Sequence, residues 1–279
     1  MIEFQLFRVK VFLAEQMNLL EPERSRSDIL REVIESLPEA QLRRGVLWHL
    51  GNVEAIGSDS LYFRVGRTTT STLEVFEDGK FADQMFETAP YTHVLIHLPT
   101  EVCVIAKKPQ LSYRTHGVAN QLARLFEHAD TAIKLETQFE IGEITDPEDF
   151  ISHLKNAFSI SKFAVWFSQP NPFDVNEDFI RPAQRLVRAS NGQQGKTELK
   201  GQQLNASVLE DISRSAAATG DDAVAWLKPT QAKRRVKKRL KGNPVILTQE
   251  HVDDAESKAS LLQRMLDLYR RVRHSGDSK

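Results

Sequence analysis

Ile2-Glu-Phe-Gln-Leu-Phe-Arg-Val-Lys-Val-Phe-Leu13 is the stretch from which we interpret the fold of this chain. Apolar residues occupy every second position, first at 2, 4 and 6 and then at 9, 11 and 13. A period of two is typical of a β-strand. A secretory signal has a basic start followed by an uninterrupted apolar run, and this stretch has neither. We therefore expect a strand here and no secretory signal.

The residues that follow predict one helix and then a series of strands. Ser27 can cap a helix that Pro38 stops, and apolar side chains recur between them at helical spacing. Strand-like stretches follow at 46–50, 60–65, 73–76, 93–98 and 101–106. The turn sequences Gly51-Asn52, Gly57-Ser58-Asp59 and Asp78-Gly79 separate them. Residues 1–130 are thus expected to form a β-rich domain with a mostly antiparallel sheet.

Residues 131–250 predict a second, α/β domain, and residues 251–279 predict a C-terminal helix. Helices are expected at 115–128, from Asp146-Pro147, near 175–189 and at 206–219, with strands at 133–141 and 163–167. The last helix, from about 253 to 273, has an apolar stripe that could pack on its own chain or on a second copy in a homodimer. The expected fold class is α+β.

One segment of the chain is strongly basic. The protein has 37 Lys and Arg against 38 Asp and Glu. Residues 228–241 contain no acid and hold eight of the cations, namely Lys228, Lys233, Arg234, Arg235, Lys237, Lys238, Arg239 and Lys241. Without them the chain has 29 basic and 38 acidic residues, a net charge of −9. A positive patch on an acidic body indicates an anionic partner, most commonly nucleic acid.

The basic segment is compatible with two conformations. A helix over 230–242 would align Ala232, Val236 and Leu240, and it is the preferred interpretation. The alternative is the second arm of a β-hairpin whose first arm is 223–228. In both cases we expect the cations to project together into water, because burying an unpaired charge is very costly. A solvated surface that only aids solubility is the simplest alternative, although such surfaces usually mix both signs.

Phosphate contact is the functional interpretation of the segment. Lys and Arg bind phosphates without reading bases, which gives sequence-tolerant binding that weakens with salt. Trp226, just upstream, could stack on an unpaired base or belong to the core. A membrane surface is disfavoured, since Val236 and Leu240 are the segment's only large apolar residues to insert. We expect no membrane partner and a cytoplasmic protein.

Catalytic signals are weaker. Glu198-Leu199-Lys200, with Asp174 or Asp178 upstream, could serve a metal-dependent nuclease or toxin, but a triplet this short arises readily by chance. His93 and His97 are better explained as structural residues than as metal ligands. Cys103 lies in an apolar run and is expected to be a buried, inert thiol. We predict no metal site and no cofactor.

Several segments carry a resemblance to known proteins. They are Ser60–Phe63, the run from Val94 to Ala106 with the helix after it, the strands between Ile133 and Phe167, and Phe167-Ser-Gln-Pro-Asn-Pro-Phe173. The first three resemble, in their order, elements of the RexA-like exclusion proteins of phage lambda. The last resembles a strand-to-Pro-Asn-Pro junction in bacterial proteins associated with phage defence. The resemblance implies a DNA-binding dimer in a phage-defence setting.

The predicted function is therefore sequence-tolerant binding of nucleic acid, with DNA preferred and RNA left open, in phage defence or exclusion. Two other classes stay open: a metal-dependent nuclease or toxin, and a protein-interaction partner within a defence complex. A nuclease requires its metal and Glu198, whereas a binding protein requires neither. A protein-interaction partner would show no salt-dependent retention on nucleic acid.

Overall fold

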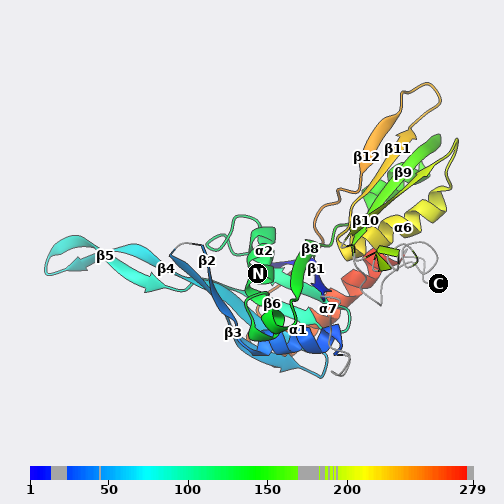
Figure 1. The fold of residues 1–279 in the computed structure, drawn as a ribbon. Coiled ribbons are helices and arrows are strands. Elements are labelled where there is room, and N and C mark those ends of the chain that lie inside the picture. The colour runs from blue at the N-terminus through cyan, green and yellow to red at the C-terminus, as the bar shows by residue number, and fades with distance from the viewer. Residues whose placement is uncertain are drawn as a thin grey trace.

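Two antiparallel sheets of unequal size form the framework of the protein (Figure 1). The structure is a computed structural model, and it describes residues 1–13, 24–43, 45–168 and 194–274, with residues 182, 186, 187, 189, 190 and 192. Every strand pairing within these residues is antiparallel. Helices pack on both sheets, and the predicted α+β class is confirmed.

The larger sheet has the strand order β13-β1-β7-β6-β4-β3-β2, with β8 paired to β1 and β5 paired to β4. Its strands are β1 (Ile2–Phe12), β2 (Glu39–Arg43), β3 (Val46–Ile56), β4 (Ser60–Glu77), β5 (Lys80–Thr88), β6 (Tyr91–His97), β7 (Val102–Ala106), β8 (Gln138–Glu143) and β13 (Ile246–Gln249). The predicted N-terminal strand thus lies inside the sheet. On one edge, the first half of β1 pairs with β13 and the second half pairs with β8. On its other edge β1 pairs with β7.

Both faces of this sheet are buried around β1, and this explains why the sequence of β1 changes phase. Phe7, Val9 and Val11 pack in a core with helices α1 (Arg26–Glu35) and α2 (Thr115–Phe126). Phe4 and Leu6 belong to a second core on the other face. The first half of β1 thus directs its apolar side chains to one face of the sheet, and the second half directs them to the other. This change of face explains why the apolar positions shift by one residue between Leu6 and Phe7.

The smaller sheet has the order β10-β9-β11-β12. Its strands are β9 (Ser159–Ser168), β10 (Gln194–Lys200), β11 (Ala223–Lys228) and β12 (Val236–Arg239). Helix α6 (Ala206–Thr219) packs on β9, and α4 (Glu148–Lys155) packs on α6. Phe163, Ala225 and Leu227 of this sheet share a core with Phe4 and Leu6 of the larger one. The two sheets are thus joined by continuous apolar packing.

The C-terminal helix α7 (Ala255–Arg273) lies within the same chain's core. Its apolar stripe of Leu261, Met265, Tyr269 and Val272 is buried against α6 and strands of the larger sheet. Of the two arrangements left open by the sequence, the structure has the one within the chain. The homodimer therefore stays a prediction without support from this helix.

Several predicted elements differ from the structure. The strand expected at 133–141 is wrong at its start, because α3 (Asp130–Lys134) precedes β8. Gly51-Asn52 is a bulge inside β3 rather than a turn. Asp78-Gly79 is the predicted turn, with left-handed φ values of 50° and 76°. The helix expected near 175–189 and the Pro-Asn-Pro junction at 170–172 lie mostly or wholly outside the described residues.

The predicted division at residues 130 and 250 stays a prediction of domain organisation. Strands β8 and β13 hydrogen-bond to β1 across the first boundary, and α7 shares a core with Leu247 across the second.

The ends of β4 and β5 form a long arm that extends from the sheet (Figure 1). Its side chains Phe76, Phe81 and Met85 are 62%, 85% and 75% exposed.

Candidate nucleic-acid interface

The smaller sheet has one face in the core and one face directed away from it. Phe163, Val165, Ala225 and Leu227 alternate onto the core side. The residues between them, together with those opposite in the strand register, make up what we call the outer face. The outer face consists of Lys162, Ala164, Trp166, Lys196, Glu198, Lys200, Val224, Trp226, Lys237 and Arg239.

The basic segment forms a hairpin, so the preferred helix was wrong and the alternative is confirmed. Residues 236–239 form β12 on the edge of the sheet, and 229–235 form the loop that joins it to β11. On a helix Lys233 would face Lys237, and Arg234 would face Lys238, with mutual repulsion. A strand sends neighbouring cations to opposite sides, and β11 offers backbone partners to β12.

The eight predicted cations are not all brought together. Lys237 and Arg239 lie on the outer face, while Lys233, Arg234 and Arg235 are exposed in the loop and Lys228 ends β11. The expectation that all of them project together was wrong for two residues. Lys238 alternates to the opposite side of β12, and Lys241 lines a groove beside the acids Glu140, Glu143 and Asp222.

Three further cations on this face were missed by sequence reasoning. Lys162 comes from β9, and Lys196 and Lys200 come from β10. They are far from the basic segment in the sequence, and no run of charges marks them. The strand register brings Lys162 opposite both Trp226 and Lys200. Only the alternation of Lys162 and Trp166 with the buried Phe163 and Val165 could have indicated which side they face.

Lysines surround the two tryptophans of the outer face. The Nζ of Lys162 lies 4.5 Å from the centre of the Trp226 ring, and the Nζ of Lys237 lies 5.5 Å from it. The Nζ of Lys196 lies 5.0 Å from the centre of the Trp166 ring. These are cation–π distances. Trp226 and Trp166 are half-buried, so part of each ring is open to solvent.

Glu198 is an acid held between lysines of the outer face. Its carboxylate oxygens lie 2.8 Å from Lys162 Nζ, 3.0 Å from Lys200 Nζ and 3.5 Å from Lys196 Nζ. Hydrogen bonds from Lys162 and then Lys200 lower the pKa of Glu198 to about 2. The carboxylate is therefore ionised at every physiological pH. Asp222, the acid nearest Arg239, is ion-paired with it.

The nuclease triplet is therefore in an unsuitable place for a metal ion. Three lysine ammonium groups occupy the neighbourhood of Glu198, and they would repel a divalent cation. Asp174 and Asp178, the proposed partners, lie outside the described residues. Among the residues that the structure does describe, no group of three or more His, Cys, Asp and Glu could hold a metal.

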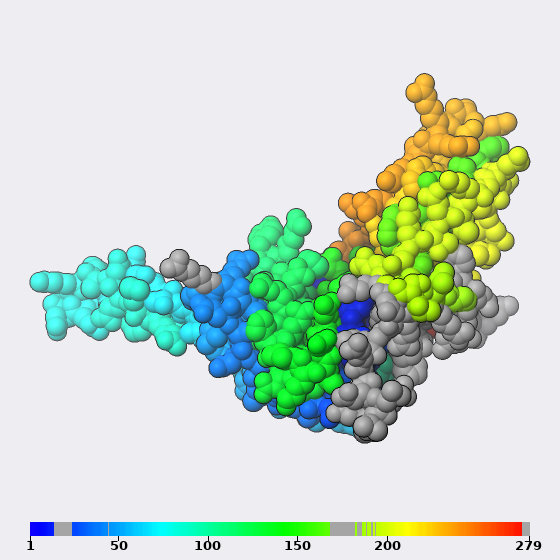
Figure 2. Space-filling view, in the orientation of Figure 1, coloured from blue at the N-terminus to red at the C-terminus, as the bar shows by residue number. Residues whose placement is uncertain are grey.

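A pocket of about 300 Å³ opens beside Trp226. Its lining residues are Ser161, Lys162, Lys200, Gly201, Trp226 and Arg235. The pocket thus joins the outer face to the loop of the basic segment through Arg235. Figure 2 shows that the end of the β11–β12 hairpin (orange) projects from the molecule.

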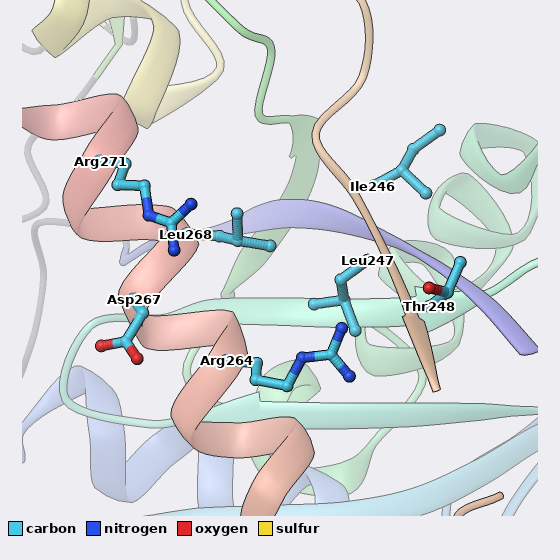
Figure 3. A pocket seen from close by; sticks show the side chains of 7 residues that line it. All are labelled: Ile246, Leu247, Thr248, Arg264, Asp267, Leu268 and Arg271. Carbon is cyan, nitrogen blue, oxygen red and sulfur yellow. The ribbon is translucent and has the colours of Figure 1, made fainter. Parts of the chain in front are cut away.

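A second groove of about 300 Å³ lies between α7 and β13 (Figure 3). Arg264 and Leu268 extend from the helix towards the strand, and Arg271 and Asp267 also line the groove. The guanidinium of Arg264 is already engaged, since its Nη1 donates to Gln249 Oε1 at 2.7 Å. Asp267 adds a negative charge. This groove is consequently a weaker anion site than the outer face.

The histidines and the cysteine have structural surroundings. Tyr62 Oη and His93 Nδ1 are 2.5 Å apart, and His97 Nδ1 lies 2.8 Å from Thr100 Oγ1. Burial lowers the pKa of both imidazoles, which favours their neutral forms. Cys103 is buried, and burial raises the pKa of its thiol far above the usual range. A neutral buried thiol is a poor nucleophile.

A scan against protein-family models found no match, and no curated protein matches the chain. Within the residues described, no helix combines the length and the apolar character needed to cross a membrane. Function must therefore be argued from the geometry of the outer face.

Proposed function

We propose that this protein binds DNA through phosphate contacts made by the outer face and the 229–235 loop, with little dependence on sequence. The observation that carries the proposal is the gathering of cations from β9, β10 and β12 on one face of the smaller sheet beside two tryptophans. Lysine ammonium groups on flexible stems act as point charges for phosphate. Phosphate contacts position a nucleic acid without reading its sequence.

The proposal extends to the setting of the protein. The resemblance to RexA-like exclusion proteins supports a role in phage defence within the cytoplasm, as a homodimer or with a protein partner. This part of the proposal rests on the resemblance alone. It can fail while DNA binding holds.

The test is a salt titration of binding to fluorescently labelled duplex DNA and RNA. If about five cations meet phosphates, the logarithm of the affinity for duplex DNA should fall with the logarithm of salt at a slope near −4 to −5. Lys237→Gln with Arg239→Gln should reduce that slope by about 1.8, because each lost contact removes about 0.9. Replacing Lys237, Lys238 and Arg239 together by Glu should abolish binding.

The matched control removes two charges from the same segment but not from the outer face. Lys238→Gln with Lys241→Gln should leave the slope nearly unchanged, since neither side chain lies on that face. All variants should keep their fold, because the substituted side chains are exposed or half-buried and lie at the edge of the sheet. Equal binding by the wild type and the triple Glu variant would mean that the segment is only a solvated surface.

Glu198→Gln separates a binding protein from a nuclease. Removing the carboxylate frees Lys162, Lys196 and Lys200 for phosphate, so a binding protein should gain affinity, by about fivefold at low salt. A metal-dependent nuclease would instead lose activity with this variant and with a chelator. Cleavage of DNA that the chelator and Glu198→Gln both abolish would contradict the proposal.

A further inference from the structure

The outer face has features that phosphate contact alone does not use. Trp226 and Trp166 lie on it, although tryptophan is among the largest apolar side chains and the core side of the same sheet is filled with apolar residues. Lysine ammonium groups lie at cation–π distances from both rings. A flexible lysine can leave a ring and follow a phosphate, and the ring face is then free.

We propose that the outer face binds an unpaired nucleic-acid strand whose bases stack on Trp226 and Trp166. The inference rests on the proposed function and names the form of nucleic acid that this face prefers. Stacking on an aromatic ring needs an open base face, which a single strand offers and an intact duplex hides between its stacked pairs. Stacking also accepts every base, so binding stays independent of sequence.

The strand register gives the spacing of the two stacking positions. Trp226 lies opposite Lys162, and Trp166 is four residues further along β9. At about 3.3 Å per residue this separation is roughly 13 Å. Ala164 and Val224, which lie side by side in the row between the two rings, are buried, at 0% and 1% exposed. A strand running along β9 would thus pass over the side chains that cover this row and meet the two rings in turn.

Charges follow the same path. Lys200, Lys162 and Lys237 flank Trp226 in one row across the sheet, and Lys196 lies opposite Trp166. The pocket beside Trp226 is lined by Lys162, Lys200 and Arg235. A base that enters the pocket therefore has cations near the phosphate of its own nucleotide. Rings alternating with cations are the usual arrangement in proteins that hold single strands.

The experiment uses three labelled ligands of equal length. A thymidine strand and the same strand with every base removed also have equal charge, and a duplex, whose charge density is higher, is the structural contrast. Trp226→Leu should weaken binding to the thymidine strand by about tenfold and leave the base-free strand unaffected. In the wild type the thymidine strand should bind more tightly than the base-free one. Equal affinity of the wild type for these two strands would overturn the inference about base stacking. If both affinities still fell with salt, the proposed phosphate binding would stand.

Tryptophan fluorescence supplies a second measurement that does not depend on the Leu variant folding. The chain has three tryptophans, and Trp48 is buried in the other core. The thymidine strand should quench the wild type, and Trp166→Phe with Trp226→Phe should abolish the quenching, because only Trp48 then emits. Unchanged emission of the wild type on saturation with the thymidine strand would also overturn the inference. Absence of binding to all three ligands would instead reject the proposed function itself.

Discussion

Arg8 is the largest fully buried side chain of the described residues. It lies on β1, where the alternating pattern assigns polar residues to one side of the strand. Helix α7 covers that side, and Arg8 Nη1 donates a hydrogen bond to Tyr269 Oη at 2.6 Å. Its guanidinium carbon also lies 5.7 Å from the centre of the Tyr269 ring. The tyrosine thus contributes both an acceptor and a ring face to the burial of this cation.

Tyr269→Phe should therefore lower the free energy of unfolding by about 1.5–3 kcal/mol, the usual contribution of a hydrogen bond to a charged group. The ring and its packing are retained, so the loss reports the hydroxyl. Urea unfolding measures it. Tyr113→Phe is the control, since Tyr113 is 87% exposed and its substitution should change stability by less than about 0.5 kcal/mol. Equal stability of the two variants would show that the hydroxyl of Tyr269 is dispensable.

At the scale of elements, the link between β12 and β13 depends on a glycine. A Cβ built on Gly242 would lie 1.9 Å from the carbonyl oxygen of Asp146 and 2.7 Å from its carbonyl carbon. The sequence assigned this glycine to the end of a helix. The structure places it where two backbone segments touch, since Asp146 N also donates to Asn243 O at 2.9 Å.

Gly242→Ala should destabilise the protein by about 1–3 kcal/mol, because backbone atoms must move to admit the methyl group. Thermal unfolding is the appropriate measurement. Gly51→Ala serves as the comparison, since a Cβ on Gly51 meets nothing within 4 Å and its backbone is not left-handed. If both variants melt at the wild-type temperature, the contact between Gly242 and Asp146 is looser than the structure has it.

Elements with a strong local pattern could be predicted from the sequence, and those fixed by pairing could not. The helix expected at 206–219 coincides with α6, where Asn205 caps the start and Gly220 the end. Strands β5 and β10 have few apolar residues on a regular alternation, and partner strands rather than their own pattern define them. The basic segment was misassigned for the same reason, because its partner β11 decides its conformation.

The candidate site was predictable only in part. A dense run of charge is visible in the sequence, and it led to Lys237 and Arg239. The contribution of Lys162, Lys196 and Lys200 depends on which strands lie side by side, and a single sequence does not contain that information. The depressed pKa of Glu198 follows from the same neighbours.

At the scale of the whole molecule, the two sheets are held by one continuous core to which Leu6, Phe163, Ala217 and Met265 all contribute. Lys10 of β1 also forms an ion pair with Asp221 at 2.8 Å, in the turn between α6 and β11. The core side of the smaller sheet is consequently occupied. A ligand bound on the outer face need not disturb the packing between the sheets.

The position of β1 has a consequence for the order of folding. The strand is made before β8 and β13 during synthesis, and one of its edges stays unpaired until these two strands exist, with Gln249 of β13 pairing with Ile2. Pairings that join distant parts of a chain form slowly, because a long loop must close before they gain any contact. An incomplete chain that ends before β13 leaves that stretch of β1 with open backbone groups, which is a template for joining other chains. We therefore expect nascent chains of this protein to depend on chaperones until β13 has been made.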